Sequence, residues 1–395
     1  MDQAFVKVMI SEAVRIATLP FRIMPIKRNR IVFTGLTGGK NYDYSCNPRY
    51  VYEYLRDKYP GWFEYVWAVS DKNKYAFLEE EGVKLVKHFT VSSFPMLLTA
   101  KVIVTNGSYA PWFPFRKKQY VINTWHGGGA YKKVENDRPD ANWATKKRAR
   151  FCAENIDLFV ASCKVQEENM IQKTFLYHGD VLRAGTPRND KLVRQETEEF
   201  QRKVKERYGI PDNGKIVLYA PTYRMPSMPV VLESDRLLQK LNEGLLNGTH
   251  EGERWFFMCR YHRYQEGAGL QILGENIIDV SDYPDMQELL CAADMLLTDY
   301  SSCIWDYSFL KRPCFLYVPD KEEYIQNTGF YVGMEQWPYK QAKTMEELEE
   351  DIAQYDDGWQ SEQIQKHWTL LGNYEQGRCC EQLADKILEQ TENNI

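Results

Sequence analysis

Hydroxyl and carboxylate side chains gather in the sequence T-D-Y-S-S, where a predicted buried strand at 295–298 ends and a helix is predicted to begin. Thr298, Asp299, Ser301 and Ser302 would lie at the start of that helix. Unpaired backbone N–H groups and the helix dipole favour a phosphate at such a place. The same residue types also serve simply as helix N-caps, so this stretch alone leaves both interpretations open.

A second predicted strand, at 120–125, ends in Trp125 and His126, and three glycines follow. In open α/β sheets ligands bind at the carboxyl ends of the strands, and glycine lets the backbone come close to them. The unperturbed pKa of histidine, about 6.5, suits a base near neutral pH. His126 could instead be a turn histidine that caps a helix. Lys132 and Lys133 could bind an acceptor or belong to a solvated face.

Cationic side chains follow two other predicted strands, with Arg188 after 181–184 and both Arg260 and His262 after 254–259. The planar guanidinium of arginine can grip a diphosphate. Such a set suits transfer of a phosphoryl-linked group, because cations stabilise the leaving diphosphate while a base deprotonates the attacking hydroxyl. It suits a glycosyltransferase equally well. The strand at 215–219 ends in a further polar sequence, A-P-T-Y-R, which supplies Thr222, Tyr223 and Arg224.

Strand and helix patterns alternate along the chain, which predicts an α/β protein with mainly parallel, doubly wound sheets. The length of 395 residues favours two domains. The predicted parts are an amphipathic segment at 1–28, a Rossmann-like domain at 29–195, a second at 212–360, and a tail helix at 361–395 that crosses back to the first domain. The predicted strands cover 30–34, 65–69, 83–86, 102–105, 120–125, 158–161, 181–184, 215–219, 254–259, 276–280, 295–298 and 314–318.

Composition narrows the class of protein. A hydrophobic content of 44% is ample for packed cores, and a net charge of −5 disfavours a nucleic-acid partner. Nine cysteines without a C-x-x-C pair indicate neither a zinc site nor a disulfide framework, and free thiols fit a reducing compartment. No cofactor is implied. Asp299 and Asp306 could bind magnesium, but two carboxylates do not indicate a metal site.

The amino-terminal segment combines an apolar stripe with basic residues. The first 30 residues hold six basic side chains against two acidic ones, and apolar residues recur at helical spacing at Phe5, Met9, Ala13, Ile16 and Leu19. Such a helix suits the headgroup region of an anionic membrane surface. It could instead pack on its own domain. No run reaches the length of a membrane span and no cleavage site for a signal peptide is evident, so we expect the protein to stay in the cytoplasm.

Five stretches together resemble the CDP-glycerol glycerophosphotransferase family of teichoic acid and capsule synthesis. In order they are Y-S-C-N-P-R-Y-V-Y-E-Y-L at 44–55, N-T-W-H-G at 123–127, G-T-P-R-N-D at 185–190, Y-A-P-T-Y-R at 219–224, and the run from D-M-Q-E-L-L to K-R-P at 285–313. The resemblance implies a GT-B arrangement with the cleft between two Rossmann-like domains, in a monotopic enzyme on the cytoplasmic face of the cell membrane. The implied reaction transfers glycerol phosphate from CDP-glycerol to a hydroxyl of a lipid-linked acceptor and releases CMP.

The resemblance also assigns residues. His126 matches the family's catalytic histidine and His262 its second essential histidine. The positions expected to bind the donor are Trp125, Gly127, Arg188, Thr222, Tyr223, Arg260, Ser301, Ser302 and Asp306, with support from Thr298, Asp299 and Arg224. The chain departs from the family at Gly128 and Gly129, where many members have T-P, and at Arg263, where proline is common. A CDP-ribitol or other CDP-alditol donor, a GT-B nucleotide-sugar enzyme and a non-catalytic membrane scaffold are the alternatives.

Overall fold

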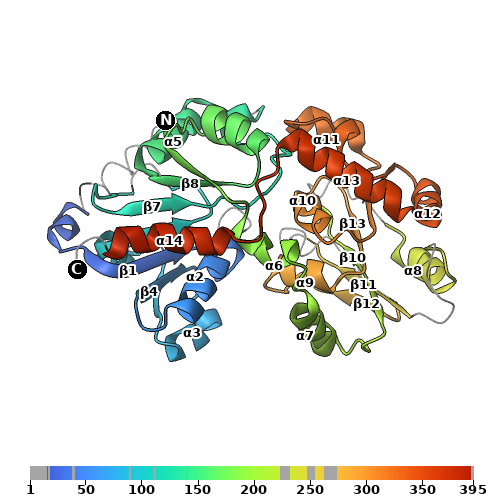
Figure 1. Cartoon of the computed structure of the whole chain (residues 1–395), viewed down its shortest axis with the longest axis horizontal. Helices are drawn as coiled ribbons and strands as arrows, with labels where there is room; N and C mark the ends of the chain where they lie inside the picture. The colour runs from blue at the N-terminus through green and yellow to red at the C-terminus, as the bar shows by residue number, and fades with distance from the viewer. Residues whose placement is uncertain are drawn as a thin grey trace, which may run out of the picture. The chain divides into compact units, whose positions relative to one another are not determined.

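The computed structural model describes residues 16, 18–37, 41–88, 90–109, 113–139, 141–222, 232–246, 254–261 and 274–392. The chain divides into two compact units (Figure 1). The first unit comprises Met1–Gly128, Lys133–Asp190 and Asn373–Ile395, and the second comprises Gly129–Lys132 and Lys191–Gly372. Each unit is built on one parallel β-sheet, which confirms the predicted α/β class with two parallel-sheet domains.

The sheet of the first unit has seven parallel strands in the order β5-β4-β1-β6-β7-β8-β9. Successive residues of its strands enter opposite layers, since Phe33 packs in one hydrophobic cluster and Val32 in the other. Both faces are therefore covered, which explains the nearly continuous apolar runs in the sequence. The strands are β1 (Lys27–Thr34), β4 (Glu64–Val69), β5 (Lys84–Lys87), β6 (Ala100–Thr105), β7 (Tyr120–Asn123), β8 (Leu158–Ala161) and β9 (Asp180–Arg183).

Helices cover the two faces of this sheet. One face is packed by α2 (Cys46–Lys58) and α14 (Cys379–Glu392), which lie side by side (Figure 1). The other is packed by α4 (Phe94–Thr99), with Phe151 of α5 (Trp143–Asn155) beside the same cluster. The last helix is fixed at its start by Asp190, whose carboxylate accepts from the backbone N–H groups of Cys379 (2.9 Å) and Cys380 (2.8 Å).

The second unit has a six-stranded parallel sheet in the order β12-β11-β10-β13-β14-β15. One face packs against α8 (Ser234–Asn242) and α12 (Met345–Ala353). On this unit α7 (Glu198–Tyr208) also packs against α9 (Met286–Ala292) (Figure 1). The strands are β10 (Lys215–Tyr219), β11 (Trp255–Cys259), β12 (Ile277–Asp279), β13 (Met295–Thr298), β14 (Cys314–Tyr317) and β15 (Gln341–Ala342).

The remaining elements complete the described chain. They are η1 (Leu19–Ile23), β2 (Leu36–Thr37), β3 (Asn41–Tyr42), η2 (Asn73–Tyr75), α3 (Phe77–Glu80), η3 (Val91–Ser93), η4 (Glu135–Asp137), η5 (Gln166–Thr174), η6 (Pro187–Asn189), α6 (Asp190–Val193), α10 (Cys303–Ser308), α11 (Lys321–Thr328), η8 (Met334–Gln336) and α13 (Asp357–Leu371).

Some sequence-based expectations about elements are wrong. The strand at 314–318 is not the last, because the two-residue β15 pairs beyond it in parallel. A helix was expected at about 164–173, and η5 is a helix there, with π-helical hydrogen bonding. The segment Leu19–Ile23 is a single 3-10 turn with proline near its start, and β1 begins at Lys27 rather than at residue 30. Most of the predicted amphipathic helix, residues 1–15 and 17, lies outside the described residues.

Candidate active site

The carboxyl edge of the first sheet collects the polar residues predicted in this half of the chain. Strand β6 leads into Asn106, β7 into Trp125 and His126, and β9 into the turn that carries Arg188. Because β6 and β7 are parallel neighbours, Asn106 and His126 emerge side by side. The site in the first unit therefore arises directly from strand order.

The imidazole of His126 has a defined tautomer. Its Nδ1 lies 2.9 Å from the backbone oxygen of Asn106. A carbonyl oxygen accepts but does not donate, so Nδ1 must carry the proton, and Nε2 then carries the lone pair. The ring also stacks on that of Trp125, with centroids 4.2 Å apart and an interplanar angle of 29°. The residue is exposed at the surface, so its Nε2 can meet a substrate hydroxyl.

The surroundings of His126 lower its pKa. The protein around the ring disfavours the charged form most, and the positive charge of Arg188 acts in the same direction. The hydrogen bond to Asn106 and the charge of Glu135 oppose this shift without reversing it. A lowered pKa keeps His126 neutral, and therefore basic, near pH 7.

Arg188 is held in a buried turn of the first unit. Its backbone N–H donates to Oδ1 of Asn47 (3.2 Å), and its Nη1 donates to Sγ of Cys46 (3.3 Å). The turn begins at Gly185, which has a φ of +93°, and a Cβ there would lie 2.2 Å from the carboxylate of Glu375. That carboxylate also accepts from the N–H and hydroxyl of Thr186. Glycine is thus required for the close approach that shapes the turn.

In the second unit, the ends of β10 and β13 are joined by Thr222 and Asp299. Oδ1 of Asp299 accepts from the backbone N–H of Thr222 (2.9 Å) and from its hydroxyl (2.5 Å). It also accepts from the N–H of Tyr300 at 2.5 Å. Asp299 is only 1% exposed, so this network is buried. The two predicted residues are therefore brought together, with Asp299 acting as the acceptor that orders Thr222.

Lys132 belongs to the same part of the second unit, although the sequence did not distinguish it from Lys133. Its Nζ lies 3.4 Å from the hydroxyl oxygen of Thr222 and 5.3 Å from the centre of the Tyr324 ring. Its backbone forms a β-bridge with Phe330. Lys133 is exposed. The position of Lys132 after the three glycines was only a weak signal of a functional role, because its contacts, Thr222 and Tyr324, lie far along the chain.

The remaining predicted residues of the second unit have mixed surroundings. Oγ of Ser301 accepts from the N–H of Cys303 (3.3 Å), as a cap would, while Ser302 makes no side-chain cap bond to α10. Thr298 is buried and donates to the carbonyl of Ala220 (2.6 Å). Asp306 is buried and accepts from Nε2 of Gln287 (2.9 Å).

Arg260 lies at the carboxyl end of β11, where its Nη1 donates to the carbonyl of Tyr283 (2.9 Å). Tyr223, Arg224 and His262 lie outside the described residues. Tyr261, which precedes His262, is described. Its backbone N–H donates to Oγ of Ser281 (3.0 Å). The role of His262 stays a prediction.

Among the residues that the structure describes, no three His, Cys, Asp or Glu side chains are grouped closely enough to hold a metal ion. The helices within the described ranges are also too short or too polar to cross a bilayer. All nine cysteines are free thiols.

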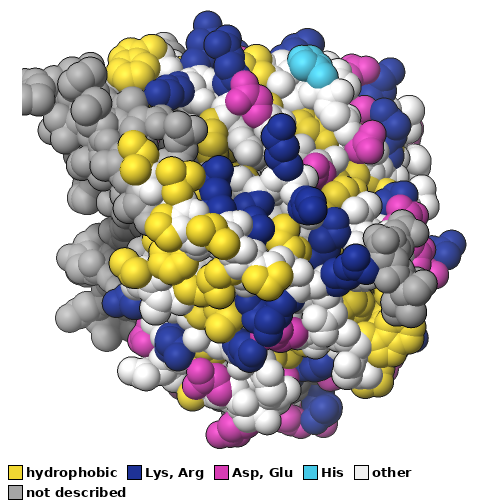
Figure 2. All heavy atoms as spheres, turned by 90° about the vertical axis from the view of Figure 1, so that its left-hand side faces the viewer, with side chains coloured by type: hydrophobic (Ala, Val, Ile, Leu, Met, Phe, Trp, Pro, Cys, Tyr) yellow, Lys and Arg dark blue, Asp and Glu magenta, His cyan; other side chains and the backbone are white. Residues whose placement is uncertain are grey.

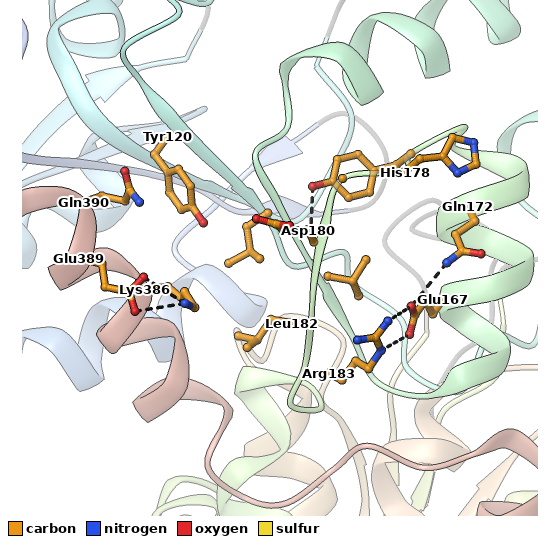
Figure 3. A pocket seen from close by; sticks show the side chains of 14 residues that line it. Tyr120, Glu167, Gln172, His178, Asp180, Leu182, Arg183, Lys386, Glu389 and Gln390 are labelled. Atoms are coloured by element: carbon orange, nitrogen blue, oxygen red, sulfur yellow. Dashed lines mark hydrogen bonds and ion pairs between the residues drawn. The ribbon is translucent and has the colours of Figure 1, made fainter.

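A cavity of about 600 Å³ lies elsewhere in the first unit, along the edge strand β9 (Figure 3). Two ion pairs lie along its lining, since Arg183 donates to Glu167 (2.8 and 2.6 Å) and Lys386 donates to Glu389. None of the predicted site residues lines it. The cavity is therefore distinct from the carboxyl edge that carries His126.

Comparison with known proteins finds a matching family and several relatives. The family described as CDP-Glycerol:Poly(glycerophosphate) glycerophosphotransferase matches residues 16–389. A teichoic acid poly(glycerol phosphate) polymerase of Bacillus spizizenii is 30% identical over 95% of this chain and 96% of its own length. One from Bacillus subtilis is 31% identical over 84% of this chain but only 44% of its own length, so the chain spans less than half of that relative.

The fold agrees as well. A solved structure of the wall teichoic acid polymerase TagF, soaked with CDPG, superposes with a TM-score of 0.82 at 24% identity, covering 100% of this chain and 99% of that one. At that identity the match concerns the fold alone. The family match, by contrast, spans nearly the whole sequence. The chain therefore belongs to the CDP-glycerol:poly(glycerophosphate) glycerophosphotransferase family and is a transferase of that family.

Proposed function

We propose that the chain transfers glycerol phosphate from CDP-glycerol to a hydroxyl of a lipid-linked teichoic acid or capsule-type acceptor and releases CMP. The family and the relatives support the donor and the transferred group. The observation that carries the chemistry is the fixed tautomer of His126, an exposed residue whose Nδ1–H is bound to the backbone oxygen of Asn106, which leaves the lone pair on Nε2.

In the proposed reaction, Nε2 of His126 takes the proton of the acceptor hydroxyl as its oxygen attacks the phosphorus nearer to glycerol. A new P–O bond forms to the acceptor, and the bond from that phosphorus to the bridging oxygen breaks. The electron pair of that bond leaves with CMP. Arg188 lies near enough to His126 for its charge to lower the pKa of the imidazole, and the same charge would stabilise the developing negative charge on phosphate.

In the second unit, we assign donor binding to the carboxyl edge of the sheet. Thr222, held by Asp299, and Arg260 lie at the ends of neighbouring strands β10 and β11. Ser301 and Ser302 follow the next strand on the other side, β13. A carboxyl edge with hydroxyls and a guanidinium is the usual place for a nucleotide diphosphate in such a sheet. Lys132 adds a cation beside Thr222.

The acceptor's lipid suggests a membrane surface as the working place of the enzyme. Leu19, Ile23 and Met24 are exposed apolar side chains, and the basic residues Lys27 and Arg28 follow them exposed in β1. Figure 2 shows a face on which hydrophobic side chains gather among many Lys and Arg side chains. Apolar and basic groups on one face support peripheral binding to an anionic leaflet, on the cytoplasmic side where CDP-linked donors would be available.

The test is nucleotide release by the purified chain with a lipid-linked acceptor. We expect the chain to release CMP from CDP-glycerol. Release of CMP from CDP-ribitol instead, or of UDP from a UDP-sugar, would identify another donor. His126→Ala should abolish release. His178→Ala is the matched control, because His178 is an exposed histidine of the same unit that lines the cavity of Figure 3. Equal rates for both variants would contradict the proposed chemistry.

A further inference from the structure

We propose that Asn47 is the positioning residue that orients both His126 and Arg188 for the reaction. Asn47 lies in the first turn of α2, within the Y-S-C-N-P sequence, and its side chain is completely buried. Because this side chain is buried, we assign it no contact with the donor or the acceptor in the proposed reaction. Its importance comes from the backbone groups that it holds.

The amide of Asn47 bonds to two segments that are far apart in sequence. Its Nδ2 donates to the backbone oxygen of Trp125 at 2.8 Å and to that of Thr124 at 3.2 Å. Its Oδ1 accepts from the backbone N–H of Arg188 at 3.2 Å. One side chain thus uses both its donor and its acceptor to connect the residue before His126 to the residue that carries the nearby guanidinium.

The conformation of Trp125 shows why this connection is needed. Trp125 has a φ of +50°, in the left-handed region that a bulky residue adopts only when its surroundings enforce it. Its N–H donates to Oδ1 of Asn123 at 2.8 Å, while its carbonyl accepts from Asn47. Both of its backbone polar groups are therefore held by buried amide side chains. This left-handed residue turns the chain at the end of β7 and sets the direction of His126.

The other side of His126 is fixed in the same manner. The carbonyl of Gly127 accepts from Nε2 of Gln166 at 2.6 Å, and Oε1 of Gln166 accepts from the N–H of Ser162 at 2.7 Å. Gln166 is itself buried. The imidazole therefore projects from a backbone that is held on both sides. Asn47, Asn123 and Gln166 hold this backbone. Of these three, Asn47 also binds the backbone of Arg188.

This inference rests on the proposed function, since positioning matters only if His126 is the base. Asn47→Asp keeps the shape of the side chain but places a carboxylate oxygen against the two carbonyls that Nδ2 now binds. We expect the backbone of Trp125 to shift. A misplacement of about 1 Å in a reacting group costs about 100-fold in rate, so kcat should fall by about that factor while KM changes much less.

Two readouts separate positioning from folding. The first is the kcat of CMP release at a temperature where the variant is folded by circular dichroism. The second is the pKa of His126, followed by NMR titration without any substrate. We expect this pKa to rise towards about 6.5 in Asn47→Asp, because the ring loses its fixed place within the surrounding protein and beside Arg188, and because the new carboxylate acts in the same direction. Asn47→Ser, which is smaller and adds no charge, is measured in the same way and should show the same two changes, so that a rise in the pKa there cannot come from a new carboxylate.

Asn155→Asp is the matched control, because Asn155 also donates from Nδ2 to a carbonyl, that of Phe151 (2.8 Å), at the end of α5. We expect it to leave kcat and the pKa of His126 unchanged. Unchanged kcat and unchanged His126 titration in a folded Asn47 variant would overturn the positioning role. A wild-type chain that releases no CMP would instead overturn the proposed function, and the NMR titration would still test what Asn47 does to His126.

Discussion

The carboxylate of Asp299 binds Thr222 twice, once through the backbone N–H and once through the hydroxyl. These residues end two adjacent parallel strands, β13 and β10, which already share a ladder of hydrogen bonds. The carboxylate continues that ladder beyond the strands with side-chain bonds. As a result, the hydroxyl of Thr222 has a fixed direction, and its oxygen can accept from Lys132.

Thr222→Val should weaken donor binding more than it slows the reaction. The variant loses the hydroxyl that Lys132 contacts and leaves the buried Asp299 with one donor fewer. We expect a higher KM for CDP-glycerol and a free energy of unfolding lower by about 1–3 kcal/mol. Steady-state kinetics and denaturant unfolding measure the two effects. Thr369→Val, which removes an exposed hydroxyl that donates to Gln365, should change neither.

Lys132→Met should raise the KM for CDP-glycerol, because it removes a cation beside Thr222 while keeping an apolar side chain over the Tyr324 ring. We expect about a tenfold change, as for one charge-assisted hydrogen bond. Lys133→Met is the neighbouring control, since Lys133 is exposed. Equal KM values for the two variants would show that the position of Lys132 has no bearing on the donor.

The pH profile should report the lowered pKa of His126. A base must be unprotonated, so kcat/KM should fall as the pH drops through the pKa of His126 and level off above it. Because the surrounding protein and Arg188 lower this pKa, the acid limb should lie below pH 6.5. Arg188→Met should move that limb to higher pH, since it removes a positive charge that disfavours the imidazolium. A limb that stayed in place would show that another group controls it.

Acid should destabilise the fold through His367, which is buried in the second unit. Its Nδ1–H donates to the carbonyl of Gln336 (2.9 Å), so its Nε2 accepts from the hydroxyl of Tyr131 (2.8 Å). Burial lowers its pKa to about 4. Between pH about 6.5 and 4 the unfolded chain binds a proton that the native protein does not, so stability falls as the pH falls through this window.

In His367→Gln, the loss of unfolding free energy between pH 6.5 and 4 should be smaller by about 3 kcal/mol than in the native sequence. Denaturant titrations at several pH values measure this difference. His88 provides an internal comparison, because burial lowers its pKa to about 3 and its contribution has the same sign. The variant should therefore retain part of the acid sensitivity. An unchanged pH dependence would mean that His367 is protonated in the native state.

The sequence predicted the strands well where apolar runs are bounded by polar turns. The strand at 295–298 has the predicted bounds, and His126 follows β7 as expected. It did not predict β15, whose two residues form a strand only because β14 offers an open edge. A helix was expected near η5, but its π-helical hydrogen bonding was not, since i→i+5 bonding is rare in proteins and no residue pattern was available to predict it.

The sequence allowed us to predict which residue types form the candidate site, but not the hydrogen bonds that connect them. Asp299 was expected to support a ligand, and the structure shows it ordering Thr222. Nothing local distinguishes Asn47, which reads as a residue at a helix start, because its partners lie 77 to 141 positions away. Lys132 likewise depends on contacts with distant residues. Such roles come from tertiary structure, which spacing along the chain does not encode.

The placement of α14 constrains how the chain can fold during synthesis. Leu383, Ala384 and Ile387 complete the same hydrophobic cluster that holds Phe33 and Val51. When the first 190 residues have emerged from the ribosome, the residues of α14 that complete this cluster have therefore not yet been synthesised. The early half of the protein must wait, with apolar surface uncovered, until all of the inserted second unit has been translated.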